Sequence, residues 1–166
     1  MPVVNFEALP GSARAWVFGA AAPVVGAAAQ SLLSAVDTHL ADWRAHGAPL
    51  VCAREWRDDR FLVIGVDEAA TGATGCSIDG LFHLLRDIES LIGTSLVGGG
   101  TVFWRDAAGV VVSGARPAFR EAAGRGDVVP DSPVFDTTVT TVGAYRTGFE
   151  KAAADSWQGK LLPVVQ

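Results

Sequence analysis

Lysine is almost missing from this chain, which carries only Lys151 and Lys160 in 166 residues and has a formal net charge of -5. A protein that binds nucleic acid needs a basic face to neutralise phosphates. The arginines here are scattered along the chain rather than clustered. We therefore expect no nucleic-acid partner.

Cysteine is also scarce, since Cys52 and Cys76 are the only two. Two cysteines at this separation form neither a disulfide framework nor a metal-binding motif, so we expect no metal, no cofactor and a reducing, cytoplasmic location. Long apolar runs are lacking too. The alanine- and glycine-rich stretch 15–29 is short and contains Pro23, so we expect neither a membrane span nor a signal peptide.

Apolar residues, in contrast, make up 49% of the chain, and charged residues only 19%. A length of 166 residues fits a single domain, 1–166, with a sizeable core. The apolar surplus has two explanations, which the sequence leaves open. Either the protein is a well-filled monomer, or it buries part of its surface in a homo-oligomer.

The hydrophobic patterns predict alternating strands and helices. The N-terminal part is expected to contain a strand at 16–18, a helix from about 23 to 46, a hairpin of 50–56 with 60–66, a helix within 71–93 and a hairpin of 102–105 with 110–112. This β-α-β-β-α-β order is typical of a ferredoxin-like α+β fold, with both helices on one face of an antiparallel sheet. The second strand of the last hairpin would extend that sheet.

The C-terminal part reads as a less regular α/β extension. Its expected elements are a short helix at 117–123, a strand at 134–140, a helix capped by Thr141 and running to Phe149, and a final turn at 156–162.

A glycine-rich turn running into a helix, 71–93, is the most suggestive stretch for a functional site. Cys76 is expected at the helix start, where unpaired N–H groups and the helix dipole stabilise a thiolate. A nucleophilic cysteine also needs a base. His83 lies about 10 Å further along the helix axis at 1.5 Å per residue, and His39 or His46 could approach only through the fold. The alternative is that Cys76 is a small packing residue.

The polar residues of the same stretch also allow two interpretations. Ser77 suits a helix cap and Asp79 suits the first turn, or else Gly72, Gly75 and Ser77 bind a ligand at the helix N-terminus. Asp79 and His83 are four residues apart and so share a helix face. They form either an acid–base pair or a solvent-facing pair.

Trp157, in the segment Asp155-Ser156-Trp157, is the remaining candidate ligand-binding residue. It would either anchor the C-terminal tail to the domain or form one wall of a pocket over the glycine-rich turn.

Three segments together resemble a family of short bacterial proteins without a characterised activity, whose members often carry the label "ABC transporter ATPase". They are 60–67 (RFLVIGVD), 72–79 (GATGCSID) and 155–157 (DSW). The resemblance implies a family, and we take no activity from it. An ATP-binding P-loop requires a lysine after its glycines, and no lysine follows Gly72 or Gly75.

Two functions remain as expectations. The first is a cytoplasmic protein that associates with itself and binds a small ligand or another protein. The second is a small enzyme with its site at the Gly72–Asp79 turn, using Cys76 or the Asp79/His83 pair. The expected partners are a second copy of the chain and a small molecule.

Overall fold

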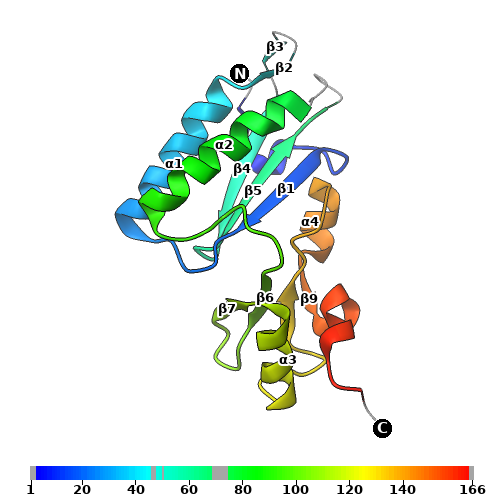
Figure 1. Cartoon of the computed structure of the whole chain (residues 1–166). Coiled ribbons are helices and arrows are strands. Elements are labelled where there is room, and N and C mark those ends of the chain that lie inside the picture. The colour runs from blue at the N-terminus through cyan, green and yellow to red at the C-terminus, as the bar shows by residue number, and fades with distance from the viewer. Residues whose placement is uncertain (1–2, 46–47, 50, 69–74, 165–166) are drawn as a thin grey trace. The chain divides into compact units, whose positions relative to one another are not determined.

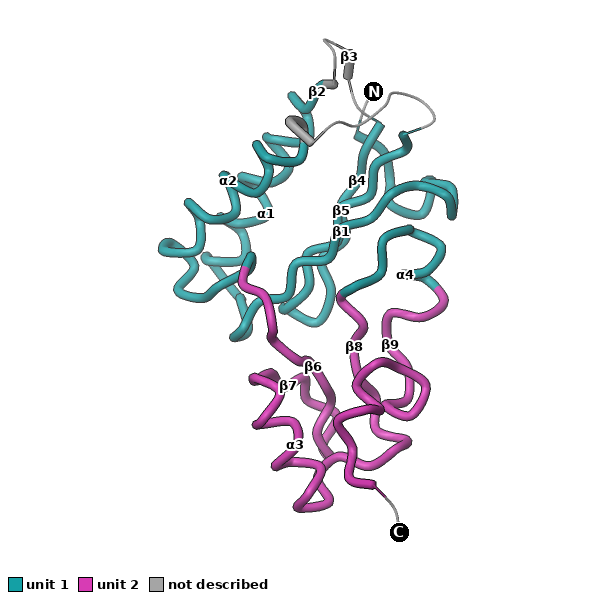
Figure 2. The backbone as a smooth tube through the Cα atoms, turned by 45° about the vertical axis from the view of Figure 1, so that its right-hand side comes forward, with its two compact units in different colours: residues 1–97, 138–146 teal, residues 98–137, 147–166 magenta. Residues whose placement is uncertain are grey.

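The computed structural model describes residues 3–45, 48–49, 51–68 and 75–164. The chain divides into two compact units, each built from two stretches of sequence (Figure 2). Unit 1 contains residues 1–97 and 138–146, and unit 2 contains residues 98–137 and 147–166. The prediction of a single folding domain stays a prediction, because compact grouping does not say whether the units fold separately.

Unit 1 is built on an antiparallel sheet with strand order β1-β5-β4. Its elements are the 3₁₀ helix η1 (Phe6–Ala8), β1 (Arg14–Gly19), α1 (Gly26–Ala41), β2 (Arg44–Ala45), β3 (Ala48–Pro49), β4 (Cys52–Arg57), β5 (Phe61–Val66), α2 (Gly75–Ile92) and most of α4 (Val142–Gly148). β2 and β3 form a separate two-stranded ladder.

Both long helices cover the same face of this sheet, as predicted (Figure 1). Leu32, Val36 and Leu40 form the buried stripe of α1, and Trp43, which follows the helix, is buried as well. The apolar face of α2 packs into the same cluster, where Phe82 meets Phe18 edge to face. The 3.6-residue period of both segments is the reason that their apolar side chains face one core.

β5 is buried along its whole length, because the opposite face of the sheet is covered as well. A Cβ added at Gly65 would lie 2.4 Å from Leu9, 3.1 Å from Val142 and 3.4 Å from Phe6. η1 and α4 therefore pack directly on this face. Arg146 ties the two together by donating hydrogen bonds to the carbonyl oxygens of Phe6 and Leu9, at 3.1 and 2.9 Å.

The predicted hairpin between β4 and β5 is confirmed, and it turns at Asp58 and Asp59. Both have positive φ, 57° and 56°, which is the backbone of a type I′ turn. α1 begins at Gly26, three residues after the predicted start at Pro23. The reason is that residues before Gly26 bond to the hairpin instead, with Val24 N–H donating to Asp59 O at 2.8 Å.

Unit 2 has a second antiparallel sheet with strand order β7-β6-β8-β9. Its elements are β6 (Val102–Arg105), β7 (Val111–Gly114), α3 (Arg116–Gly124), β8 (Pro133–Phe135), β9 (Glu150–Ala152), and the 3₁₀ helices η2 (Ala153–Asp155) and η3 (Trp157–Leu161). Val102, Trp104, Phe119, Val134 and Leu161 are among its core residues. The predicted hairpin, the predicted helix at 117–123 and the C-terminal turn are confirmed, and β9 is an element that the sequence did not suggest.

The predicted strand 134–140 is divided between the two units. β8 ends at Phe135, and its continuation pairs with β1 instead: Ala15 N–H donates to Thr140 O at 2.9 Å, and Arg14 bridges Thr141. Thr141 then caps α4 as predicted, since its Oγ1 accepts a hydrogen bond from Ala144 N–H at 3.0 Å.

An α+β fold is what the structure shows, but the strand order does not confirm the ferredoxin-like topology. The first three strands have the order that this topology requires, with the third between the first and second. The strand expected to complete the sheet, β6, pairs with β7 and β8 in the second sheet instead.

Among the described residues, no helix is long and apolar enough to cross a membrane.

Candidate functional site

Most of the glycine-rich turn, including Gly72, lies outside the described residues. The backbone of Gly75, Cys76 and Ser77 forms the first turn of α2, and the side chains of these residues are not described. Ser77 is the third residue of the helix, so α2 begins before the position that we predicted for its cap.

Asp79 and His83 lie further along α2, and both side chains are exposed. Within the described part of the chain, no hydrogen bond or ion pair joins them. This arrangement matches the solvent-facing alternative, because a carboxylate orients a catalytic histidine only through a hydrogen bond.

A different histidine contacts α2. The ring of His39, from α1, lies against Gly80, where an added Cβ would be 3.4 Å from its Cε1 atom. Burial lowers the pKa of His39, and its Nε2 atom is buried without a hydrogen-bond partner among the described residues. Gly80 follows Cys76 by four residues, so the two backbone positions share a helix face. The fold thus brings an imidazole to the face of α2 that includes position 76.

Cys52 is a packing residue. It is fully buried, its thiol lies 3.7 Å from Leu40 O, and burial raises its pKa to about 11.

Trp157 packs against the core of unit 2. The guanidinium of Arg116 lies 5.4 Å from the centre of its ring. Its indole N–H is buried and has no acceptor among the described residues. These contacts favour the anchor interpretation, and the pocket-wall alternative stays a prediction.

The open edge of β4 is a feature that the sequence did not reveal. Among the described residues, β4 pairs with β5 alone, and the N-terminal segment adds one parallel bridge, in which Val4 N–H donates to Cys52 O at 3.0 Å. In an antiparallel ladder, main-chain groups of alternate residues point to opposite sides. Since the Cys52 carbonyl points away from β5, the N–H and C=O groups of Arg54 and Trp56 do so too. None of these four groups has a partner among the described residues.

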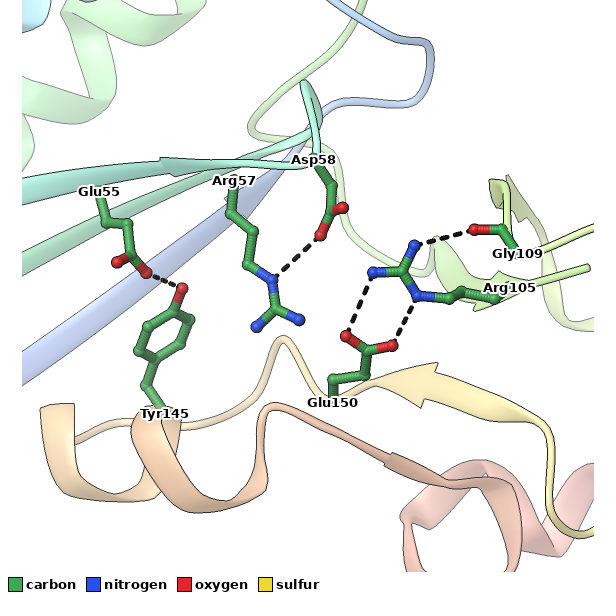
Figure 3. Close-up of polar contacts among 7 residues, drawn as sticks. All are labelled: Glu55, Arg57, Asp58, Arg105, Gly109, Tyr145 and Glu150. Atoms are coloured by element: carbon green, nitrogen blue, oxygen red, sulfur yellow. Dashed lines mark hydrogen bonds and ion pairs between the residues drawn. The ribbon is translucent and has the colours of Figure 1, made fainter.

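Charged side chains lie on both faces of β4. Arg54 makes a two-pronged ion pair with Asp37 of α1, at 2.7 and 2.9 Å, and the hydrogen bond to this carboxylate raises the pKa of Arg54. On the other face, the hydroxyl of Tyr145 donates to Glu55, while Arg57 binds Asp58 at 3.0 Å (Figure 3). Burial, followed by the bond to Glu55, raises the pKa of Tyr145.

A hollow of about 380 Å³ borders this edge at Arg54 and Glu55. Its remaining lining comes from residues 3–7 and Asp37. The lining includes the carboxylates of Glu7, Asp37 and Glu55 and one guanidinium, that of Arg54, so it carries an excess of negative charge. The hollow can therefore receive a cationic side chain, while Arg54 offers a position for an acidic one.

The charged groups of unit 2 mainly fasten its own loops. Arg105 bonds both carboxylate oxygens of Glu150, at 2.6 and 3.2 Å, and donates to Gly109 O at 3.0 Å (Figure 3). A hollow of about 580 Å³ in this unit is lined in part by Asp106, Arg125 and Asp127. Arg125 and Asp127 pair with each other, and Asp106 accepts two N–H bonds from its own turn. No group of three or more histidine, cysteine or acidic side chains suited to a metal ion occurs in the part of the chain that the structure describes.

Comparisons of the chain with known protein families, with curated proteins and with solved structures give no match. The resemblance carried by segments 60–67, 72–79 and 155–157 therefore stays a prediction.

Proposed function

We propose that this protein is a self-associating interaction protein, in which unit 1 binds an extended segment along the open edge of β4. The observation that carries the proposal is the row of unpartnered main-chain groups at Arg54 and Trp56, beside a hollow. An exposed strand edge binds a further strand through main-chain hydrogen bonds, and neighbouring pockets select its side chains. Strand addition therefore suits the second copy of the chain that is expected as a partner from the sequence.

Two finer expectations belong to this proposal. A cytoplasmic location is supported by the free, buried thiol of Cys52. A relation to ferredoxin-like folds is supported only by the first part of unit 1, where two helices cover one face of a sheet with the order β1-β5-β4.

Light scattering after size exclusion tests self-association at micromolar concentration. We expect a particle of twice the 17.2 kDa chain mass. A monomer at every concentration would overturn the proposal.

A proline variant tests the edge itself. Arg54→Pro removes an N–H group that points away from β5, so it should abolish association while leaving the β4–β5 ladder intact. Arg54→Ala is the matched control, because it also loses the pair with Asp37 but keeps the N–H group. If both variants associate like the parent chain, the interface lies elsewhere than β4.

A small enzyme at the start of α2 is the second candidate, and one observation favours it. His39, rather than His83, contacts the helix at Gly80, one turn from Cys76. In this function Cys76 would act as the nucleophile and the neutral imidazole of His39 as its base.

A further inference from the structure

We infer that the segment bound at this edge is β4 of a second copy, running antiparallel, with Trp56 opposite Trp56 of the partner subunit. This inference rests on the proposed function, and it names the partner and the register. It follows from the direction of the main-chain groups and from the order of charges along the strand.

The main chain limits the register. Arg54 and Trp56 present their N–H and C=O groups to the open side, whereas Glu55 faces β5. In antiparallel pairing, residues that present these groups must stand opposite each other. A symmetric strand pair places one residue opposite the same residue of the partner subunit. This central residue can then be Arg54, Glu55 or Trp56.

The charges distinguish these three registers. Residues 54–58 read Arg-Glu-Trp-Arg-Asp. Centring on Trp56 places Glu55 opposite the partner's Arg57, and symmetry repeats this pair. Centring on Glu55 places two carboxylates opposite each other, and centring on Arg54 does the same with two guanidinium groups. Directly opposed like charges destabilise a strand pair and opposite charges stabilise it, so the Trp56 register is favoured.

Glu55 keeps one oxygen for the intermolecular pair, since it accepts one hydrogen bond from Tyr145 and a carboxylate has two oxygens. Arg57 already bonds Asp58 and the Tyr145 hydroxyl within its own chain, and the contact with the partner's Glu55 would be added to these bonds.

The surroundings of β4 also fit a short pair. The carbonyl of Cys52 already accepts a hydrogen bond from the N–H group of Val4, so a new ladder can begin only at Arg54. In the Trp56 register the partner's Asp58 comes opposite Arg54. Asp58 and Asp59 both have positive φ, so the partner's chain turns away from the shared ladder after this pair.

Charge reversal tests the register. Glu55→Arg alone and Arg57→Glu alone each place like charges opposite each other at two symmetric positions, so each should raise the dimer dissociation constant about tenfold. The double variant Glu55→Arg/Arg57→Glu should restore the parent affinity. An equimolar mixture of the two single variants should form a heterodimer, because both of its pairs are again opposite in charge. Analytical ultracentrifugation measures all four samples, and melting curves check that each variant is folded.

Failure of this inference can be told from failure of the proposed function. If the parent chain dimerises and the single variants dimerise equally well, self-association stands and the register is wrong. The register is also wrong if the single variants are monomers that neither the double variant nor the mixture rescues. If the parent chain is a monomer, self-association itself is wrong.

Discussion

Cys52 shows how burial alone settles the chemistry of a side chain. Its thiol is enclosed by the core of unit 1, and desolvation raises its pKa to about 11 because a buried thiolate is unfavourable. His39 responds to the same effect with a lowered pKa, since burial disfavours its cation. A neutral imidazole is the form that can accept a proton from a thiol.

Alkylation tests the enzyme alternative at this scale. If Cys76 is a nucleophile, it should react first in the native protein between pH 6 and 9, with an inflection below the free thiol value of about 8.5. Cys52 should stay unlabelled until the protein unfolds or the pH approaches 11. Mass spectrometry locates the label.

The His39→Ala variant should slow the labelling of Cys76, because it removes the imidazole that lies against α2. His83→Ala is the control, since His83 lies two turns from Cys76. Equal labelling rates in both variants would contradict a role for His39. Resistance of Cys76 itself in the native protein would make it a packing residue.

β5 illustrates how one element depends on its smallest residue. Both faces of the strand are covered, and Gly65 leaves room for η1 and α4 to approach the sheet. The continuous apolar run 61–66 is what a strand buried on both faces requires.

Gly65→Ala should lower the free energy of unfolding by about 1–3 kcal/mol, because the added Cβ overlaps Leu9 and presses on Val142. Urea unfolding measures the difference. Gly99→Ala is the matched control, since nothing lies within 4 Å of its Cβ position and the change should be close to neutral. Equal stability of the two variants would mean that η1 and α4 do not pack on this strand as described.

At the scale of the whole molecule, the two units are interlaced along the chain. Most of α4 belongs to unit 1, yet β8 before it and β9 after it belong to unit 2. Neither unit is therefore a continuous piece of sequence.

We expect one cooperative unfolding transition, because loss of β8 and β9 releases both ends of α4 and so weakens unit 1. Urea titration followed by tryptophan fluorescence and by far-ultraviolet circular dichroism should give coincident curves. Two separate transitions would show that the units are independent domains.

The sequence by itself determined the local elements. The stripe of Leu32, Val36 and Leu40 specified α1, and the Asp58–Asp59 turn specified the β4–β5 hairpin. Thr141 specified the start of α4. Each of these follows from residues close in the chain, whose periodicity or backbone preference acts without help from distant segments.

Only the tertiary structure decided which strands share a sheet and which side chains meet. β6 joined the second sheet although its order along the chain suited the first, and residues 134–140 served both units. The contact of His39 with Gly80 and the open edge of β4 arise in the same way. The physical reason is that pairing between distant segments reflects the packing of the whole core, which local patterns do not encode.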